Sequence, residues 1–256
     1  MIDLYADRPD LYDLLHDDLS ADITFYSGIA GAVVPPGGRV LELGCGSGRI
    51  MAALLEGGYR VTGLDKEPAM LKRAAQRLAN QAGDHKRLVL GDMCRPDLGD
   101  ERYDLILVSA NTFMHLPDHA AHHACLMAIH RHLAQNGTAL LDLANPFHTI
   151  TLPQGVITLR RRGRDAATGQ EVTVTGALEV DPTAPTAVDH LFFDLEEEGG
   201  TLCRLSSRVE LRLVFMPELE LLLAARGLGI ADAYGDYDLG PYTASAERMI
   251  VVIRRL

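Results

Sequence analysis

The segment with the clearest chemical meaning is a glycine-rich turn after a short apolar run, Glu42-Leu43-Gly44-Cys45-Gly46-Ser47-Gly48-Arg49. Glycine lacks a Cβ, so a ligand can approach the backbone closely there, and the chain can adopt the positive φ angles of a tight turn. Asp65 follows Gly44 by 21 residues and ends the next apolar run. A carboxylate at that separation can accept hydrogen bonds from both hydroxyls of a ribose. The pattern therefore predicts a nucleoside site.

The spacing of the glycines narrows the class of ligand that this turn could bind. Gly44, Gly46 and Gly48 form a G-x-G-x-G pattern, and Arg49 stands where a dinucleotide-binding turn carries its third glycine. This spacing fits an adenosyl ligand without a pyrophosphate better than NAD. A glycine-rich turn is a weak signal by itself, because a strand-to-helix connection can use the same residues with no ligand.

Alternating strands and helices must position this turn. Apolar β-type runs occur at 39–43, 60–64, 87–90, 103–108 and 138–143, and helical patterns occur at 50–55, 68–79 and 117–133. The last of these helices should end at Asn136-Gly137, a typical C-terminal stop. This rhythm predicts an α/β fold with a doubly wound, mostly parallel sheet of seven strands, completed by runs at 230–233 and 248–253.

The pattern changes between residues 155 and 215. Four segments there alternate apolar and polar residues, as half-buried antiparallel strands do. We therefore expect three parts: an N-terminal helical lid at 1–36, a cofactor-binding core at 37–149 and 215–256, and an antiparallel β insertion at 150–214. The insertion would bind substrate or form a homodimer.

Composition excludes several classes of function. The chain has 256 residues and a net charge of −11, which disfavours a polyanionic partner such as nucleic acid. Its dense basic run is short, Arg160 to Arg164. No apolar stretch reaches 18 residues and the N-terminus does not read as a signal, so we expect no membrane association. Four scattered cysteines predict reduced thiols in a cytoplasmic protein with no metal site.

With these motifs in register, the sequence resembles the class I S-adenosylmethionine-dependent methyltransferases over most of the chain. Val61 to Asp65, Gly91-Asp92-Met93, Tyr103 to Asn111 and Gly137 to Asp142 match their later motifs. The resemblance implies a Rossmann-like methyltransferase fold, S-adenosylmethionine as cofactor and S-adenosylhomocysteine as product. It implies a cofactor site made of Glu42, Gly44, Cys45, Gly46, Gly48, Arg49, Asp65, Lys66, Asp92, Met93, Ser109, Ala110 and Asn111.

The chain is more specifically similar to small-molecule members, including the N,N-dimethyltransferases of nucleotide-linked amino sugars. The segments that carry this similarity are Tyr12 to His16, Asn111 to Leu116 and the β insertion. The similarity implies that His115 lies near the acceptor amine and that Tyr5 lies beside the sulfonium. The register at Tyr5 is off by one residue, and the segment from Asp142 to His148 departs from those enzymes.

Other residues are candidates to line the acceptor site. The loop that carries Tyr237 and Tyr242 connects the last two strands and should reach the carboxyl edge of the sheet. Tyr12 could form part of the lid or belong to a helix core. Asn145 and His148 follow the fifth strand at a pocket edge, although Asn145-Pro146-Phe147 also resembles a partial signature of nucleic-acid amine methyltransferases.

Three further histidines share one helix. His119, His122 and His123 have spacing that a metal site could use, but no carboxylate pattern completes such a site. We expect these side chains to face solvent.

The function that these observations favour is methyl transfer to N or O of a small-molecule acceptor by in-line displacement. His115 and Tyr5 are the residues expected nearest the reacting centre. The alternatives are an RNA or protein methyltransferase and a non-catalytic S-adenosylmethionine-binding protein. A basic stripe beside the pocket would favour the former, and a pocket with no room beside the sulfonium would favour the latter.

Overall fold

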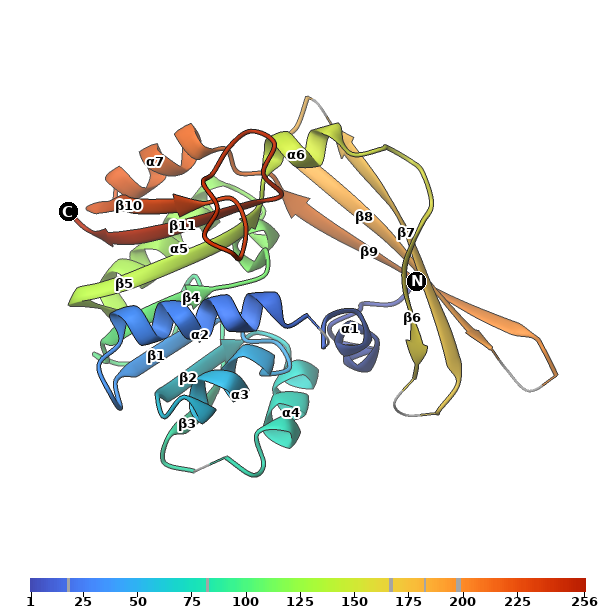
Figure 1. Ribbon diagram of the computed structural model, residues 1–256, viewed down its shortest axis with the longest axis horizontal. Helices are drawn as coiled ribbons and strands as arrows, with labels where there is room; N and C mark the ends of the chain where they lie inside the picture. Colours follow the sequence, from blue (N-terminus) through green and yellow to red (C-terminus); the bar gives the residue numbers. More distant parts are fainter. Residues whose placement is uncertain (18, 82, 166–167, 182, 197–198) are drawn as a thin grey trace.

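The computed structural model describes residues 1–17, 19–81, 83–165, 168–181, 183–196 and 199–256. The core is a seven-stranded sheet in the order β10-β11-β5-β4-β1-β2-β3 (Figure 1). Of the seven strands, β11 alone runs opposite to the others, which confirms the mostly parallel, doubly wound sheet. The strands are β1 Arg39–Leu43, β2 Arg60–Asp65, β3 Lys86–Leu90, β4 Tyr103–Val108, β5 Leu133–Ala144, β10 Leu228–Tyr234 and β11 Arg248–Arg255.

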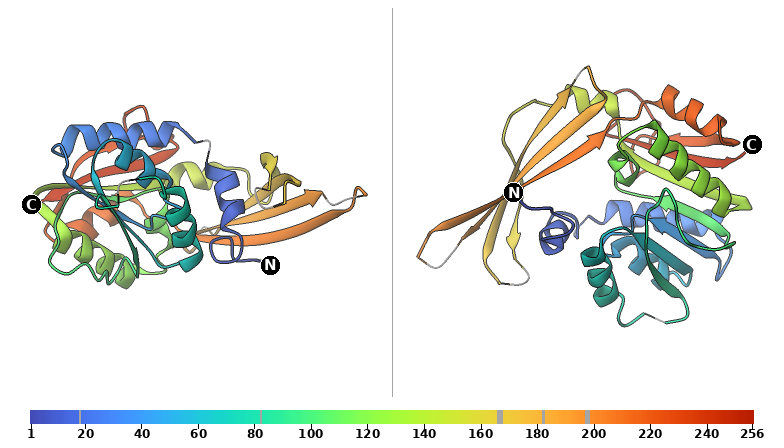
Figure 2. Two further views of the ribbon diagram at one scale, coloured as in Figure 1. Left: turned by 90° about the horizontal axis from the view of Figure 1, so that it is seen from below. Right: turned by 180° about the vertical axis from the view of Figure 1, so that it is seen from behind.

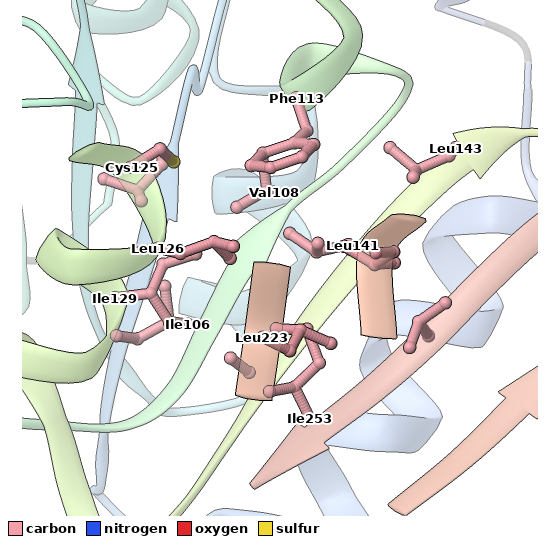
Figure 3. Packing of buried hydrophobic residues seen from close by; sticks show 14 of the residues in the cluster. Ile106, Val108, Phe113, Cys125, Leu126, Ile129, Leu141, Leu143, Leu223 and Ile253 are labelled. Atoms are coloured by element: carbon pink, nitrogen blue, oxygen red, sulfur yellow. The ribbon is translucent and has the colours of Figure 1, made fainter. Parts of the chain in front are cut away.

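Helices cover both faces of this sheet. One face packs against α2 (Ala21–Val33) and α3 (Arg49–Glu56), with α4 (Pro68–Arg77) beside them. The other face packs against η1 (Thr112–His115), α5 (His119–His132) and α7 (Met216–Ala224). Figure 3 shows side chains of the central strands meeting those of α5 and α7 in this second layer. Burial on both faces explains why the parallel strands are almost uniformly apolar in sequence.

The expected insertion is an antiparallel sheet in the order β6-β7-β8-β9. The short helix α6 (Pro146–Thr151) leads from β5 towards it, and the sheet projects beside the core in Figure 1. Its strands are β6 Thr158–Arg164, β7 Glu171–Asp181, β8 Thr186–Glu196 and β9 Leu202–Arg212.

The N-terminal segment joins the two sheets. Helix α1 (Pro9–His16) lies between the core and the insertion in both views of Figure 2. Leu4 and Leu11 pack with Phe193 and other inner-face residues of the insertion, and the backbone N–H of Ile2 donates to Ser206 O of β9 at 2.8 Å. Apolar contact and strand-edge pairing therefore hold this segment across the insertion.

The prediction that Asn136-Gly137 stops the helix at 117–133 is wrong. Helix α5 stops at His132, and Asn136 and Gly137 lie inside β5. Leu133 pairs with Tyr103 of β4, and a Cβ on Gly137 would lie 2.9 Å from Tyr103 O. The glycine thus serves a close approach between strands rather than a helix stop.

The prediction that all three α5 histidines face solvent is wrong for His122. Its side chain is fully buried and stacks on Phe113, with ring centroids 4.4 Å apart. His119 remains exposed and lies 2.6 Å from Glu218 Oε1. Within the described chain, no group of three or more His, Cys, Asp or Glu side chains is arranged to hold a metal ion.

Burial of His122 leads to a pH-dependent stability. Desolvation, followed by the charge of Arg212, lowers the pKa of His122 from 6.5 to about 4. The unfolded imidazole binds a proton as pH falls through 6.5, whereas the folded one does not until about 4, so acid destabilises the fold. Between about pH 7 and about pH 5, the free energy of unfolding of the wild type should therefore fall by about 2 kcal/mol more than that of His122→Phe.

Urea unfolding at several pH values measures this difference. His85→Gln, which changes a histidine on the loop before β3, is the matched control and should follow the wild type. Parallel stability curves for wild type and His122→Phe would contradict the assignment.

Candidate active site

A cavity of about 860 Å³ opens at the carboxyl ends of β1 to β4, a size typical of small-molecule sites. Three parts of the chain line it: the core edge with Gly44, Asp65 and Asp92, the N-terminal segment with Tyr5 and Tyr12, and the inner face of the insertion. Ligands of open α/β sheets bind at this edge, where strand order reverses between β1 and β4.

The glycine-rich turn is shaped by its neighbours as well as by the cavity. Gly44 has a φ of +73°, and a Cβ there would lie 2.3 Å from Thr112 Cγ2. Gly48 has a φ of +77° at the start of α3. Both positions therefore need glycine for the local fold, and Gly44 brings the turn against the loop after β4.

Asp65 ends β2 beside this turn. Its Oδ2 accepts a hydrogen bond from the Gly46 N–H at 2.8 Å, and its Oδ1 accepts one from the Glu67 N–H at 2.9 Å. Burial raises the pKa of Asp65, and these two N–H groups oppose the rise. Each carboxylate oxygen keeps a further lone pair, so the group can accept from two ribose hydroxyls.

The adenine side of the expected site lies after β3. Asp92 and Met93 line the cavity, and the Gly91 N–H donates to Asp65 O at 2.9 Å. Asp92 Oδ1 accepts from the Cys94 N–H at 2.8 Å. These backbone bonds place Asp92 on the same cavity edge as Asp65.

Tyr5 and His115 meet on the cavity wall although 110 residues separate them in sequence. The Tyr5 hydroxyl lies 3.3 Å from His115 Nε2, and the rings meet edge to face. Burial and then the charge of Lys66 lower the pKa of His115 to about 4, and burial raises the pKa of Tyr5. Both groups are therefore neutral at physiological pH.

Tyr12 completes this aromatic group. Its ring centroid lies 5.6 Å from that of Tyr5, and its ring edge lies about 3.9 Å from where a Gly46 Cβ would stand. Burial raises the pKa of Tyr12 to about 12. The N-terminal segment thus brings two neutral tyrosines over the glycine-rich turn.

Part of the predicted cofactor set lies behind the cavity wall. Glu42, Cys45, Arg49 and Ser109 line a separate small cavity of about 20 Å³. Ser109 Oγ donates to Glu42 Oε1 at 3.0 Å, while burial raises the pKa of Glu42 to about 8. Glu42 Oε2 has no hydrogen-bond partner among the described residues.

Arg49 holds the N-terminal segment rather than facing the main cavity. Its guanidinium forms an ion pair with the buried carboxylate of Asp22 and donates to Leu19 O at 2.9 Å. Arg49, which stands where a dinucleotide-binding turn has its third glycine, therefore holds the start of α2 against the glycine-rich turn.

Asp142 anchors the loop beneath the cavity, a role that the sequence did not reveal. Its Oδ1 accepts from Arg248 Nε at 2.9 Å, and its Oδ2 accepts from the hydroxyls of Tyr26 and Tyr237. Oδ2 also lies 3.3 Å from the Ala110 N–H. Ala110 and Asn111 line the cavity with positive φ angles, so this buried network supports a turn that would be strained alone.

The structure does not bring four predicted acceptor residues to the cavity. Asn145 donates to Thr243 O at 2.9 Å, and Tyr242 donates to Asn145 Oδ1 at 3.3 Å. Tyr237 is bound to Asp142, and His148 lies on α6 away from the lining residues. The loop reaches the sheet edge as expected, but its polar atoms are used in holding the loop together.

The insertion contributes cavity residues that the sequence analysis missed. Arg160, Asp189, Leu191, Val209 and Leu211 all line the cavity opposite the core edge. The basic run at 160–164 was a partial sequence signal for the role of Arg160 in the cavity. The sequence carried no such signal for Asp189, because its ion-pair partner Arg160 comes from another strand.

Known proteins share both sequence and architecture with this chain. Residues 40–137 match a family model described as a methyltransferase domain. The chain is 28% identical over 254 residues to a cypemycin N-terminal methyltransferase from a Streptomyces species, covering 95% of this chain and 94% of that protein.

Solved structures show the same fold. The CcbJ methyltransferase from Streptomyces caelestis superposes with a TM-score of 0.78 at 24% identity, covering 92% of this chain and 90% of that one. An amino pentose methyltransferase from Micromonospora echinaspora, solved with S-adenosylmethionine bound, gives a TM-score of 0.76 at 22% identity and covers 100% of both chains.

The residues at the core edge fit this cofactor. Asp65 has lone pairs free for a ribose, and the glycine-rich turn leaves the backbone accessible at the cavity edge. Among the described residues, no helix is both long and apolar enough to span a membrane. Residues 40–137 thus match a methyltransferase domain, and the chain is similar over nearly its whole length to an N-terminal methyltransferase.

Proposed function

We propose that this methyltransferase acts on the nitrogen of an amine carried by a small molecule or a short peptide. The observation that carries the proposal is that one cavity runs from Asp65 and Asp92 to the insertion, with the Tyr5–His115 pair on its wall. The cavity therefore has lining residues for an acceptor as well as for a cofactor, which supports an enzyme over a non-catalytic binding protein.

Methyl transfer depends more on aligning the acceptor with the methyl group than on acid–base catalysis. S-adenosylmethionine supplies a methyl group on a positively charged sulfur that is already a good leaving group. The chain's task is to hold the acceptor nitrogen in line and to exclude water. A neutral His115 and the Tyr5 hydroxyl can accept a hydrogen bond from an amine N–H, which directs the nitrogen lone pair towards the methyl group.

Relatives and charge both support an amine acceptor. One relative is named as a cypemycin N-terminal methyltransferase, and the superposed Micromonospora echinaspora enzyme is named for an amino pentose. The cavity lining mixes Lys66, Arg95 and Arg160 with four carboxylates, Asp65, Glu67, Asp92 and Asp189. Such a mixed wall is unlike the basic stripe of an RNA-binding enzyme.

Mass spectrometry tests the proposed reaction. The protein is incubated with S-adenosylmethionine and three acceptor sets: amino sugars, short peptides with free N-termini, and the matched hydroxyl or N-acetyl compounds. We expect a product heavier by one CH₂ unit only in the first two sets. Methylation of the matched controls instead would overturn the amine assignment.

The Tyr5–His115 pair gives a second test. His115→Ala should lower kcat about 100-fold, because the acceptor loses its alignment, and Tyr5→Phe should lower kcat about tenfold. Affinity for S-adenosylhomocysteine should change little in either variant. His148→Ala, a histidine outside the cavity, is the matched control. Unchanged turnover in His115→Ala would remove this residue from the mechanism.

We also propose that the β6 edge of the insertion joins two copies of the chain. Exposed apolar side chains gather at this edge: Ile157 is 62% and Leu159 is 57% exposed. An apolar strand edge of this kind favours pairing with another chain. Light scattering should give the mass of two chains for the wild type and of one for Ile157→Glu/Leu159→Glu; a wild-type mass of one chain would contradict the interface.

We place the enzyme in the cytoplasm. All four cysteines are free thiols, and Cys45 and Cys125 are buried within the core. Reduced thiols of this kind are typical of a reducing compartment.

A further inference from the structure

Asp189 lies in the acceptor half of the cavity and has no role in the reaction described above. Building on the proposed function, we propose that its carboxylate selects the acceptor: it binds the cationic form of an amine whose neighbouring atoms are apolar, and that ammonium displaces Arg160. The bound ammonium then loses one N–H proton to solvent, so that its nitrogen regains the lone pair that attacks the methyl group. The following contacts carry this inference.

The register of the insertion places Asp189 on the inner face of its sheet. Asp189 and Leu191 are two residues apart on β8, and Asp189 pairs directly with Val209 of β9. Leu191, Val209 and Leu211 line the cavity with it. The carboxylate is therefore surrounded by apolar side chains on the wall opposite Asp65 and Asp92.

Arg160 reaches Asp189 through a local irregularity of β6. The register of β6 against β7 shifts between Leu159 and Arg161, so Arg160 is the extra residue of a β-bulge. Bulges re-aim side chains, and they are frequent beside active sites. The Arg160 Nε lies 2.9 Å from where a Cβ on Gly176 would stand, so the glycine leaves room for the guanidinium to reach the cavity.

The ion pair itself can be exchanged. Arg160 Nη2 lies 3.1 Å from Asp189 Oδ1, and the two side chains are 37% and 29% exposed. Exposed pairs of this kind contribute little stability, because both charges remain partly solvated. A ligand cation that also buries apolar surface can therefore take the place of the guanidinium.

The charges around Asp189 favour a cation. Burial raises the pKa of Asp189, so an added positive charge would relieve a partly desolvated carboxylate. Tyr5 and His115 are neutral, and Asp65 and Asp92 accept backbone N–H bonds on the core side. Of the described residues that line the cavity from the insertion, Asp189 alone is acidic.

The apolar surroundings define the class of acceptor. Leu191, Val209 and Leu211 would pack against alkyl or aryl groups next to the ammonium. A diphosphate at this wall would meet the negative charge of Asp189. The arrangement therefore fits an amphipathic amine.

Two probes of the same shape test the inference. 2-Phenylethylamine is cationic and 2-phenylethanol is neutral, and each is titrated into protein saturated with S-adenosylhomocysteine, with Kd measured by ligand-observed NMR. We expect the wild type to bind the amine at least tenfold more tightly than the alcohol. Asp189→Asn should reduce this ratio to about one, Asp189→Glu should retain a preference, and Arg160→Gln should tighten amine binding alone.

Asp194→Asn is the matched control. Asp194 lies on the same strand, pairs with Arg204 and is not among the lining residues, so its variant should behave as wild type. A wild type that binds both probes equally, or neither at millimolar concentration, contradicts the role of Asp189. Loss of S-adenosylhomocysteine binding by the wild type would instead contradict the enzyme's proposed function, so the two failures are distinguishable.

Discussion

Replacing Asp65 with alanine is expected to raise the Kd for S-adenosylhomocysteine about 100-fold. Hydrogen bonds to a charged group contribute about 1.5–3 kcal/mol each, and the variant would lose two such bonds to the ribose. A loss of about 3 kcal/mol corresponds to a factor of about 100. Calorimetric titration measures the change directly.

A Tm measured beside each titration separates the ribose contact from damage to the turn. Asp65→Asn keeps one acceptor oxygen, which can serve the Gly46 N–H or the Glu67 N–H but not both. This variant should bind S-adenosylhomocysteine weakly and have a Tm between those of wild type and Asp65→Ala. Asp84→Ala removes an acidic side chain that is 83% exposed, and it should bind normally. Wild-type affinity in Asp65→Ala would show that this carboxylate does not hold the ribose.

The second large effect concerns stability. Asp142→Asn should lower the free energy of unfolding by about 3–5 kcal/mol, because it leaves the Arg248 guanidinium buried without its counter-charge. The Asp142 side chain is fully inaccessible to solvent in the fold. Chemical denaturation measures the loss, and Glu210→Gln, which removes an exposed partner of Arg208, should cost less than about 0.5 kcal/mol.

Two further variants keep this test informative if Asp142→Asn does not fold. Tyr237→Phe removes one hydrogen bond to Asp142 and should cost about 1 kcal/mol. Asp142→Asn/Arg248→Met removes both charges and should recover part of the loss. Equal stability of Asp142→Asn and wild type would mean that this network does not support the loop at Ala110.

The proximity of the glycine-rich turn and Asp65 could be predicted because its determinants are local. The glycine-rich turn and Asp65 each end a parallel strand, and adjacent parallel strands end at the same edge of a sheet. Their proximity thus follows from strand order alone. The resemblance to a family implied that Tyr5 and His115 each lie near the reacting centre, and the structure shows that their polar atoms contact each other.

The loop that carries Tyr237 and Tyr242 shows what strand order alone cannot predict, which is the partner of each side chain. Topology placed it correctly at the sheet edge, yet both hydroxyls bond to buried groups of the core. Residue type does not reveal whether a polar side chain serves a ligand or the fold. Likewise, His122 was expected in solvent because its helix face reads as polar, but Phe113 from the preceding turn covers it.

The sequence by itself determined the doubly wound core, the β insertion and the position of Asp65 beside the glycine-rich turn, because periodicity and spacing along the chain encode them. Only the tertiary structure decided the insertion wall of the cavity and the buried network beneath its loop. Arg160 and Asp189 are 29 residues apart, and Arg248 and Asp142 are 106 apart. Their meeting depends on strand register, and for Arg160 on one bulge. Register follows from the packing of whole sheets, which no local pattern records.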